Sequence, residues 1–284
     1  MLFAWKLLYP EHVHLTRGNH ETKIQNKVYG FEGEVVHKYD MKTMELFSLA
    51  FQALPLACVI TDTKPGGQRL MVTHGGLFTQ DGVTLEQIEG IYRYREPGEE
   101  GGWMSDLLWS DPQPFPGRSP SKRGVGLNFG PDVTERFLNA NDLCMLIRSH
   151  EVKDEGYVVE HGGLCVTVFS APNYCDSIGN KGAVCRLNHA ALSKPTFLQF
   201  SAVPHPPIRP SESGPRALNP PPPLFFCLSP PCQLRSHCTH SLTHSTLFNY
   251  FNPPLQTLQW RTPLALLPCL ASRSQKWNSL EAGL

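Results

Sequence analysis

Three short apolar runs constrain the fold of this chain more than any other feature of its sequence. They span residues 70–73, 144–147 and 165–169, and each leads into a polar loop. Runs this short and this rich in Val, Ile, Phe and Cys are typical of buried strands, because a buried helix is usually about ten residues or longer. We therefore predict a mixed α/β domain whose strands end in loops able to hold functional side chains.

Two helices are also predicted. Apolar residues recur at three- and four-residue steps at Met44, Phe47, Phe51 and Leu54. This spacing predicts an amphipathic helix over about 40–54, which Pro55 would end. Thr84 and Gln87 form a capping-box pattern, which predicts that a second helix begins at Thr84.

Near the start of the chain, Val13 and Leu15 alternate with polar residues. This alternation predicts a strand that ends at the turn Arg17-Gly18. The polar set Asn19-His20-Glu21 follows at once.

Composition excludes some classes of partner. The chain has 284 residues, 40% of them hydrophobic, with 25 basic and 25 acidic side chains. That hydrophobic content suffices for a core, and zero net charge gives no general attraction to nucleic acid or to an anionic membrane. Nine scattered cysteines, no signal peptide and no long apolar run lead us to expect a reducing cytoplasmic or nuclear setting.

The composition changes near residue 210. Residues 211–284 contain four consecutive prolines at 220–223 and show no sustained period. We interpret residues 1–210 as the folded domain and 211–284 as a low-complexity, Pro-rich tail that is disordered. A zinc site from Cys227, Cys232, Cys238, His240 and His244 is the weaker alternative, because this set lacks the close Cys pairs of structural zinc sites.

Polar side chains follow three of the predicted strands. Asn19 and His20 follow the first, His74 follows the run 70–73, and His150 follows the run 144–147. One such His is more often a structural residue, but loops at one edge of a sheet would bring all of them together. An amide oxygen and imidazole nitrogens suit a borderline divalent ion such as manganese, iron or zinc.

The sequence context of these residues resembles the phosphoprotein phosphatases, a metallophosphoesterase family. The similar blocks, in the family's order, are 17–21 (RGNHE), 74–77 (HGGL), 107–112 (LLWSDP), 122–125 (KRGV), 148–150 (RSH) and 170–175 (SAPNYC). The resemblance covers about residues 2–210 and is strongest to the type 5 subfamily. It implies a calcineurin-like fold, a four-layer β-sandwich flanked by helices.

The resemblance also implies roles for particular residues. It implies hydrolysis of phosphoserine and phosphothreonine monoesters on proteins by a water activated by two divalent metal ions, Mn or Fe/Zn. The matching residues are Asn19, His74 and His150 as ligands of one metal, His20 as general acid, Arg123 as phosphate-binding arginine, and Tyr174 beside the phosphate.

The chemistry supports these roles on its own terms. A phosphate monoester dianion repels nucleophiles, so cations are needed to neutralise it, and a protonated His can donate to the leaving alkoxide. The planar fork of Arg123 could bind two phosphate oxygens, although a surface salt bridge is the alternative. For Trp109 and Tyr29 we expect core packing. Cys175 is expected to be a loop thiol near the cleft.

Two blocks of the family, GDxHG and GDxxDRG, do not occur in this sequence. By the resemblance they would supply the first metal's Asp and His, a bridging Asp, the Asp that orients His20, and a further phosphate-binding Arg. We therefore expect an N-terminally truncated catalytic domain with at most one set of metal ligands. The 34-residue tetratricopeptide repeats of type 5 enzymes are also not found.

Three functional hypotheses follow. The first is a protein serine/threonine phosphatase, whose partners would be phosphoprotein substrates and regulatory proteins of unknown identity. The second is a catalytically inactive fragment that acts as a binding or decoy module. The third, a phosphatase of small phosphoesters, is disfavoured by the family resemblance around Trp109 and Tyr174.

Overall fold

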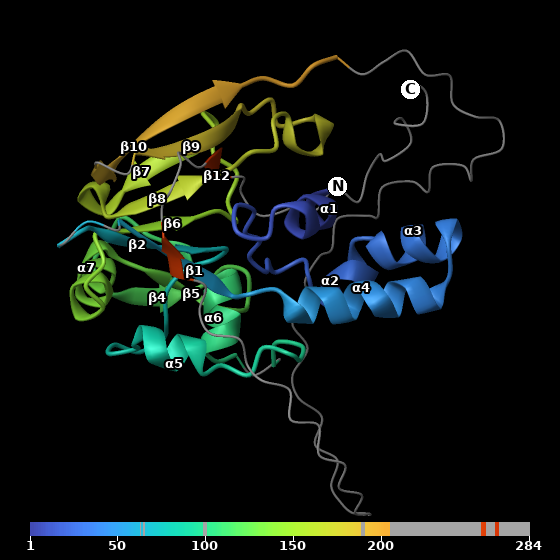
Figure 1. Ribbon diagram of the computed structural model, residues 1–284, viewed down its shortest axis with the longest axis horizontal. Helices are drawn as coiled ribbons and strands as arrows, with labels where there is room; N and C mark the ends of the chain where they lie inside the picture. The colour runs from blue at the N-terminus through green and yellow to red at the C-terminus, as the bar shows by residue number, and fades with distance from the viewer. Residues whose placement is uncertain are drawn as a thin grey trace, which may run out of the picture. The chain divides into compact units, whose positions relative to one another are not determined.

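The computed structural model describes residues 1–62, 64, 66–98, 101–188, 191–204, 257–259 and 265–266. The chain divides into two compact units, one formed by residues 1–202 with 253–284 and the other by residues 203–252. In the second unit only Val203 and Pro204 are described, and both lack regular secondary structure. The rest of the description concerns the first unit (Figure 1).

A six-stranded sheet forms its centre, in the order β11-β1-β2-β6-β8-β7. Its strands are β1 (Ala57–Thr61), β2 (Arg69–Thr73), β6 (Met145–Arg148), β7 (Tyr157–Glu160), β8 (Cys165–Val168) and β11 (Thr257–Gln259). Strands β2, β6 and β8 are neighbours and run parallel. They are the three strands predicted from the apolar runs, and because they are parallel, the loops that follow them begin at the same edge of the sheet.

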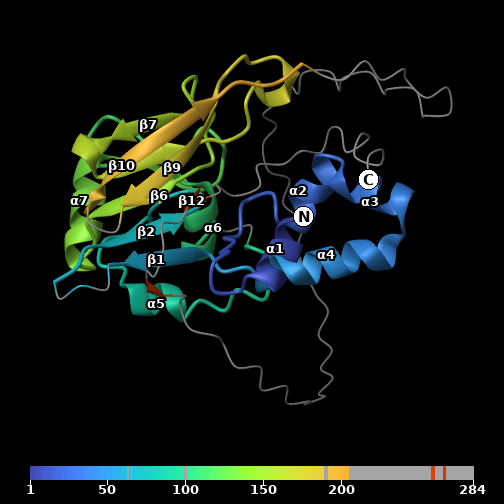
Figure 2. The same cartoon turned by 45° about the horizontal axis from the view of Figure 1, so that its top comes forward.

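The two faces of this sheet are buried by different partners. On one face, alternate residues such as Ile60, Leu70 and Val166 pack against β9 (Gly182–Asn188) and β10 (Ala191–Phe200). Strands β9 and β10 form a second sheet with β12 (Ala265–Leu266). The two sheets lie face to face in both views (Figures 1 and 2).

Helices and a small sheet cover the opposite face. They are α5 (Leu85–Glu89), α6 (Trp103–Trp109), α7 (Pro131–Ala140) and the sheet β3 (Asp111–Pro112), β5 (Leu127–Phe129) and β4 (Arg118–Pro120). Met71 and Leu146 share a buried cluster with Leu107 of α6 and Leu138 of α7. The described residues thus form two packed sheets with helices against them, which confirms the predicted mixed α/β class.

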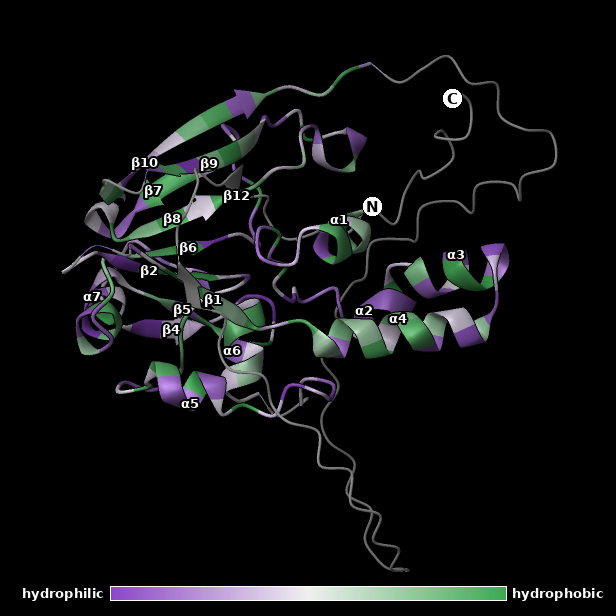
Figure 3. Ribbon diagram, viewed as in Figure 1, coloured by the Kyte–Doolittle hydropathy of each residue, from purple (hydrophilic) through white to green (hydrophobic). Residues whose placement is uncertain are grey.

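The predicted helix over 40–54 is confirmed as α4 (Met41–Ala53). The Asp40 carboxylate caps it by accepting from the Thr43 N–H at 2.7 Å, and Leu54, before Pro55, is already extended. Figure 3 shows α4 banded with apolar and polar residues. Phe47 and Phe51 of α4 pack against Phe31 in α3 (Phe31–Lys38).

The other helices are short. They are α1 (Leu2–Leu8), α2 (Lys23–Val28), α3 (Phe31–Lys38) and the 3-10 turns η1 (His161–Gly163) and η2 (Tyr174–Asp176). The predicted capping box at Thr84 and Gln87 is present and begins α5. Among the helices of the described residues, none combines the length and apolarity that a membrane span requires.

The predicted strand ending at Arg17-Gly18 is wrong. Residues 13–18 are not helix or strand. The N–H of Arg17 donates to the carbonyl of Pro55 at 2.8 Å, and the residues on either side of it are not part of a strand. Alternation alone therefore marks an extended segment here, because a strand also needs a neighbour along its length.

The expectations for residues 211–284 lie almost wholly outside the described residues. This holds for the disordered tail and for the weaker zinc alternative. Within that range the structure describes only β11, parallel to β1, and β12, antiparallel to β9.

Candidate active site

The loop after β2 places His74 at the edge of the sheet. His74 is buried, and Gly75 and Gly76 follow it. A Cβ on Gly75 would lie 2.5 Å from the backbone of Leu108, and one on Gly76 would lie 2.2 Å from the Phe129 ring. These glycines are therefore required by close packing against α6 and β5.

The loop after β6 places His150 beside this histidine. His150 has φ 72°, a left-handed conformation that is uncommon for a non-glycine residue. The N–H of the preceding Ser149 donates to the carbonyl of His74 at 3.0 Å, so the two loops are joined by their backbones. The ring centroids of the two histidines lie 4.9 Å apart.

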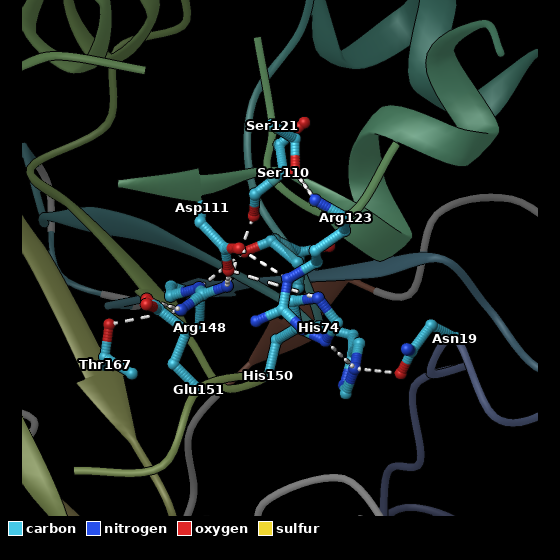
Figure 4. Close-up of polar contacts among 12 residues, drawn as sticks. Asn19, His74, Ser110, Asp111, Ser121, Arg123, Arg148, His150, Glu151 and Thr167 are labelled. Carbon is cyan, nitrogen blue, oxygen red and sulfur yellow. Dashed lines mark hydrogen bonds and ion pairs between the residues drawn. The ribbon is translucent and has the colours of Figure 1, made fainter. Parts of the chain in front are cut away.

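Three donor atoms from three loops converge at this point. Asn19 Oδ1 lies 2.7 Å from His74 Nε2, and His74 Nε2 lies 3.1 Å from His150 Nδ1. Neighbouring ligands of an octahedral ion, bound at about 2.1 Å each, would be separated by about 3 Å. Figure 4 shows Asn19 and the two imidazoles directed toward one another.

The same side chains contain unpaired buried atoms. Nδ1 of His74 and Nε2 of His150 are buried and have no hydrogen-bond partner within the described part of the chain. No group of three His, Cys, Asp or Glu side chains suited to a metal ion occurs in that part. The predicted metal ligands, Asn19, His74 and His150, are not a group of that kind, because one of them is an amide oxygen and only two are imidazoles. Asn19, His74 and His150 therefore fit one divalent cation, held by neutral donors.

Electrostatics keep both imidazoles neutral. Burial, with the charge of Arg148 and the neighbouring His20 and Arg123, lowers the pKa of His74 to about 3. Burial, with the neighbouring His74 and Arg148, also strongly lowers the pKa of His150. A neutral imidazole is the form that binds a metal, so these shifts favour a ligand role over an ion-pair role.

His20 lies next to this cluster and is half-buried. Burial, and to a lesser degree the charge of Arg123, lowers its pKa. Within the described residues, no side chain makes a hydrogen bond to its ring. The Tyr29 ring lies 4.8 Å from the His20 ring, centroid to centroid, and Tyr29 is 54% exposed. The prediction that Tyr29 packs in the core is therefore wrong.

Arg123 lies within electrostatic reach of all three histidines, since its charge contributes to each of their pKa shifts. Its Nε donates to Oδ2 of Asp111 at 2.7 Å, and its backbone N–H donates to Ser121 Oγ. The salt bridge considered as the alternative to phosphate binding is therefore present, with Asp111 mostly buried and Arg123 partly exposed.

Arg148 and Asp111 form a buried ion pair that the sequence reasoning missed. Arg148 is fully buried and donates to Asp111 Oδ1 at 2.7 Å and to Glu151 Oε2 at 2.7 Å. It also donates to the carbonyls of Gly75 and Ser110. One arginine thus connects the loop after β2, the loop after α6 and the loop after β6, and Figure 4 shows it beside Asp111.

Trp109 and Tyr174 have different surroundings. Trp109 packs against the buried cluster, as predicted, and its ring also lies edge-on to that of His150 at 5.6 Å. Tyr174, in the loop after β8, lies edge-on to Phe169 at 5.2 Å. Within the described residues it makes no hydrogen bond or ring contact with the other five predicted site residues. The adjacent Cys175 is an exposed free thiol in η2.

Five of the six predicted site residues therefore lie in one region. Asn19, His74 and His150 are in direct contact, and His20 and Arg123 lie within electrostatic reach of the two buried imidazoles. These residues come from the loops after β2 and β6, from residues 19–20 and from the turn before β5.

Known proteins are similar to this chain in sequence. Serine/threonine-protein phosphatase T of Schizosaccharomyces pombe is 56% identical over 211 residues, which are 74% of this chain and 43% of that protein. Human serine/threonine-protein phosphatase 5 is 58% identical over 209 residues, 74% of this chain and 40% of that protein. The chain thus spans about two fifths of the length of these relatives.

A solved structure agrees with the sequence relatives. A protein serine/threonine phosphatase from Saccharomyces cerevisiae, with similarity to human phosphatase PP5, aligns with a TM-score of 0.66 and 40% identity. The alignment covers 74% of this chain and 66% of that structure. Residues 1–154 match the calcineurin-like phosphoesterase family. The chain therefore belongs to the calcineurin-like phosphoesterase family and is similar to phosphatases 5 and T.

Proposed function

We propose that this chain acts in the hydrolysis of phosphoserine and phosphothreonine monoesters on proteins. The relatives at 56% and 58% identity are serine/threonine-protein phosphatases, which supports this substrate class. The convergence of Asn19 Oδ1, His74 Nε2 and His150 Nδ1 is the observation on which the proposal depends.

The residues of the site take separate roles in this proposal. Asn19, His74 and His150 would hold a divalent cation, Mn²⁺ or alternatively iron or zinc. Divalent ions, two of them in the complete family site, would neutralise phosphate charge and lower the pKa of a water. Arg123 binds phosphate oxygens through its terminal nitrogens, since its Nε is already bonded to Asp111. Tyr174 would shape access to the phosphate.

His20 would donate a proton to the leaving oxygen of the serine or threonine. The lowered pKa of His20 means that its ring is largely neutral before substrate binds. A dianionic phosphate beside the ring would favour the protonated form and raise this pKa again. His20 would then hold its proton only when there is a leaving group to receive it.

The alternative function is an inactive binding or decoy module. The neutral donor set favours it, because an amide and two imidazoles in the described residues offer no negative ligand to a divalent ion. Such a module would retain Arg123 and the loops around it and would bind phosphoproteins without turning them over.

One assay separates these possibilities. The purified full chain is incubated with Mn²⁺ and either a phosphoserine peptide or an aryl phosphate, and phosphate release is measured. We expect release from the peptide, a loss of about 100- to 10,000-fold in His20→Ala, and no change in His37→Ala, which alters an exposed histidine of α3.

The other outcomes are equally informative. Phosphopeptide binding without phosphate release would replace the enzyme proposal by the binding module. Release from the aryl phosphate alone would point to a phosphatase of small phosphoesters.

A further inference from the structure

Asp111 lies between the two arginines of the site. It forms the start of β3, pairs with Asn128 of β5 and is 8% exposed. Its Oδ2 accepts from Arg123 Nε at 2.7 Å, and its Oδ1 accepts from Arg148 Nη2 at 2.7 Å. Figure 4 shows the carboxylate of Asp111 between the two guanidinium groups.

The two arginines differ in burial and in the number of bonds that hold them. Arg148 is fully buried and bonded to two carbonyls as well as to Asp111 and Glu151. Arg123 lies in a turn before Gly124, which has φ 77°, and its side chain is 37% exposed. Asp111 is therefore anchored to a fixed arginine on one side and restrains a partly exposed arginine on the other.

This restraint determines which part of Arg123 is available. Nε is bonded to Asp111, whereas the two terminal nitrogens make no hydrogen bond within the described residues. The edge formed by these two nitrogens can bind two oxygens of a phosphate in parallel. A free arginine would lose side-chain entropy on binding an anion, and a restrained one loses less.

The same carboxylate also borders the cation ligands. Asp111 Oδ1 lies 4.0 Å from Nε2 of His150, one of the buried nitrogens without a hydrogen-bond partner in the described chain. Asp111 is thus next to both halves of the site, the imidazole cluster and the arginine.

We propose that Asp111 is a positioning residue that holds Arg123 with its two terminal nitrogens directed at a bound phosphate. The proposal rests on the proposed function, because it takes Arg123 as a phosphate-binding residue. The alternative is that Asp111 only neutralises the buried charge of Arg148 and has no effect on anion binding.

Inorganic phosphate is the probe, and NMR titration of the full chain gives its dissociation constant without any need for turnover. Four forms are compared: wild type, Asp111→Asn, Arg123→Lys and the double variant. Asp106→Asn is the matched control, since Asp106 is a buried aspartate that bonds to Thr79 rather than to an arginine.

We expect Asp111→Asn to weaken phosphate binding about tenfold and Asp106→Asn to change it less than about twofold. Because Asp111 acts through Arg123, the double variant should bind no more weakly than Arg123→Lys alone. Additive losses in the double variant, or unchanged binding in Asp111→Asn, would overturn the positioning role.

A second measurement keeps the test valid if Asp111→Asn does not fold. In the wild type, the Nε–H resonance of Arg123, assigned by its loss in Arg123→Lys, should exchange slowly with water. Rapid exchange like that of exposed arginines would refute the restraint. If the wild type binds no phosphate, the proposed function fails and the positioning role with it, whereas slow exchange would show that the contact itself exists.

Discussion

Asn19 Oδ1 and His74 Nε2 lie 2.7 Å apart, although 55 residues separate them along the chain. The bond from Arg17 N–H to the Pro55 carbonyl holds the segment before Asn19 near the start of β1. The proposed cation site therefore forms only in the folded chain, and its affinity should depend on each of the three donors.

Removing a donor should weaken cation binding. We expect Asn19→Ala or His74→Ala to lower the affinity of the chain for Mn²⁺ by at least about tenfold, since each removes one of three converging donors. Titration calorimetry measures this directly. His37→Ala on α3 is the control and should bind like the wild type. Equal affinity in all four proteins would mean that these atoms do not form a cation site.

Removing the buried arginine should destabilise the fold. Arg148→Met removes the buried cation that Asp111 and Glu151 share and leaves Asp111 paired with Arg123 alone and Glu151 with Lys153, so we expect a loss of about 3–5 kcal/mol in the free energy of unfolding. Urea denaturation provides the measurement. Arg136→Met is the control, because Arg136 pairs with Asp81 and Asp132 at 47% exposure and should cost less than about 1 kcal/mol. A similar loss in both variants would contradict the special role of Arg148.

The parts of the site that follow strands were predictable from sequence, and the reason is topological. β2, β6 and β8 are parallel neighbours, so His74 and His150, which follow two of them, had to meet at one edge. The helix start at Thr84 was also predictable, because a capping box is a local pattern complete within four residues.

What depended on long-range packing was not predictable. Alternation at Val13 and Leu15 indicates an extended segment, but not that a neighbouring strand exists. Tyr29 is exposed and lies beside the His20 ring, and no local sequence pattern predicts that position. Asp111 was part of a recognised block, yet its role comes from Arg123 and Arg148, residues 12 and 37 positions away. Those pairings are set by how β3 and the two loops pack.

Glu21 should make stability depend on pH. Burial raises its pKa from an ordinary value of 4.5 to about 7, against the opposing bond from Gly18 N–H and the charge of Arg17. Between pH 4.5 and 7 the folded chain therefore keeps a proton that the unfolded chain has lost. This retained proton stabilises the folded chain fully below pH 4.5. The free energy of unfolding therefore falls by up to about 3 kcal/mol as the pH rises from 4.5 to 7.

The variant Glu21→Gln tests this sign. Gln keeps an oxygen to accept from Gly18 N–H and cannot ionise, so its stability relative to the wild type should rise as the pH increases from 4.5 to 7. Urea denaturation at several pH values gives the difference. Parallel curves for the two proteins would show that Glu21 is ionised in the fold throughout.

Close packing after His74 can be tested with two glycine variants. Gly76→Ala should lower stability, and Gly33→Ala, the control, should raise it. A Cβ at Gly76 would lie 2.2 Å from the Phe129 ring, so Gly76→Ala should lower the free energy of unfolding by about 1–3 kcal/mol through overpacking. Gly33, inside α3, has open space around a Cβ, and Gly33→Ala should stabilise the chain by about 0.5–1 kcal/mol through helix propensity. Thermal unfolding of both variants measures the pair. If Gly76→Ala is as stable as the wild type, the loop beside His74 can accommodate a Cβ at this position. Close packing of that loop against α6 and β5 would then not be what fixes the position of the His74 imidazole.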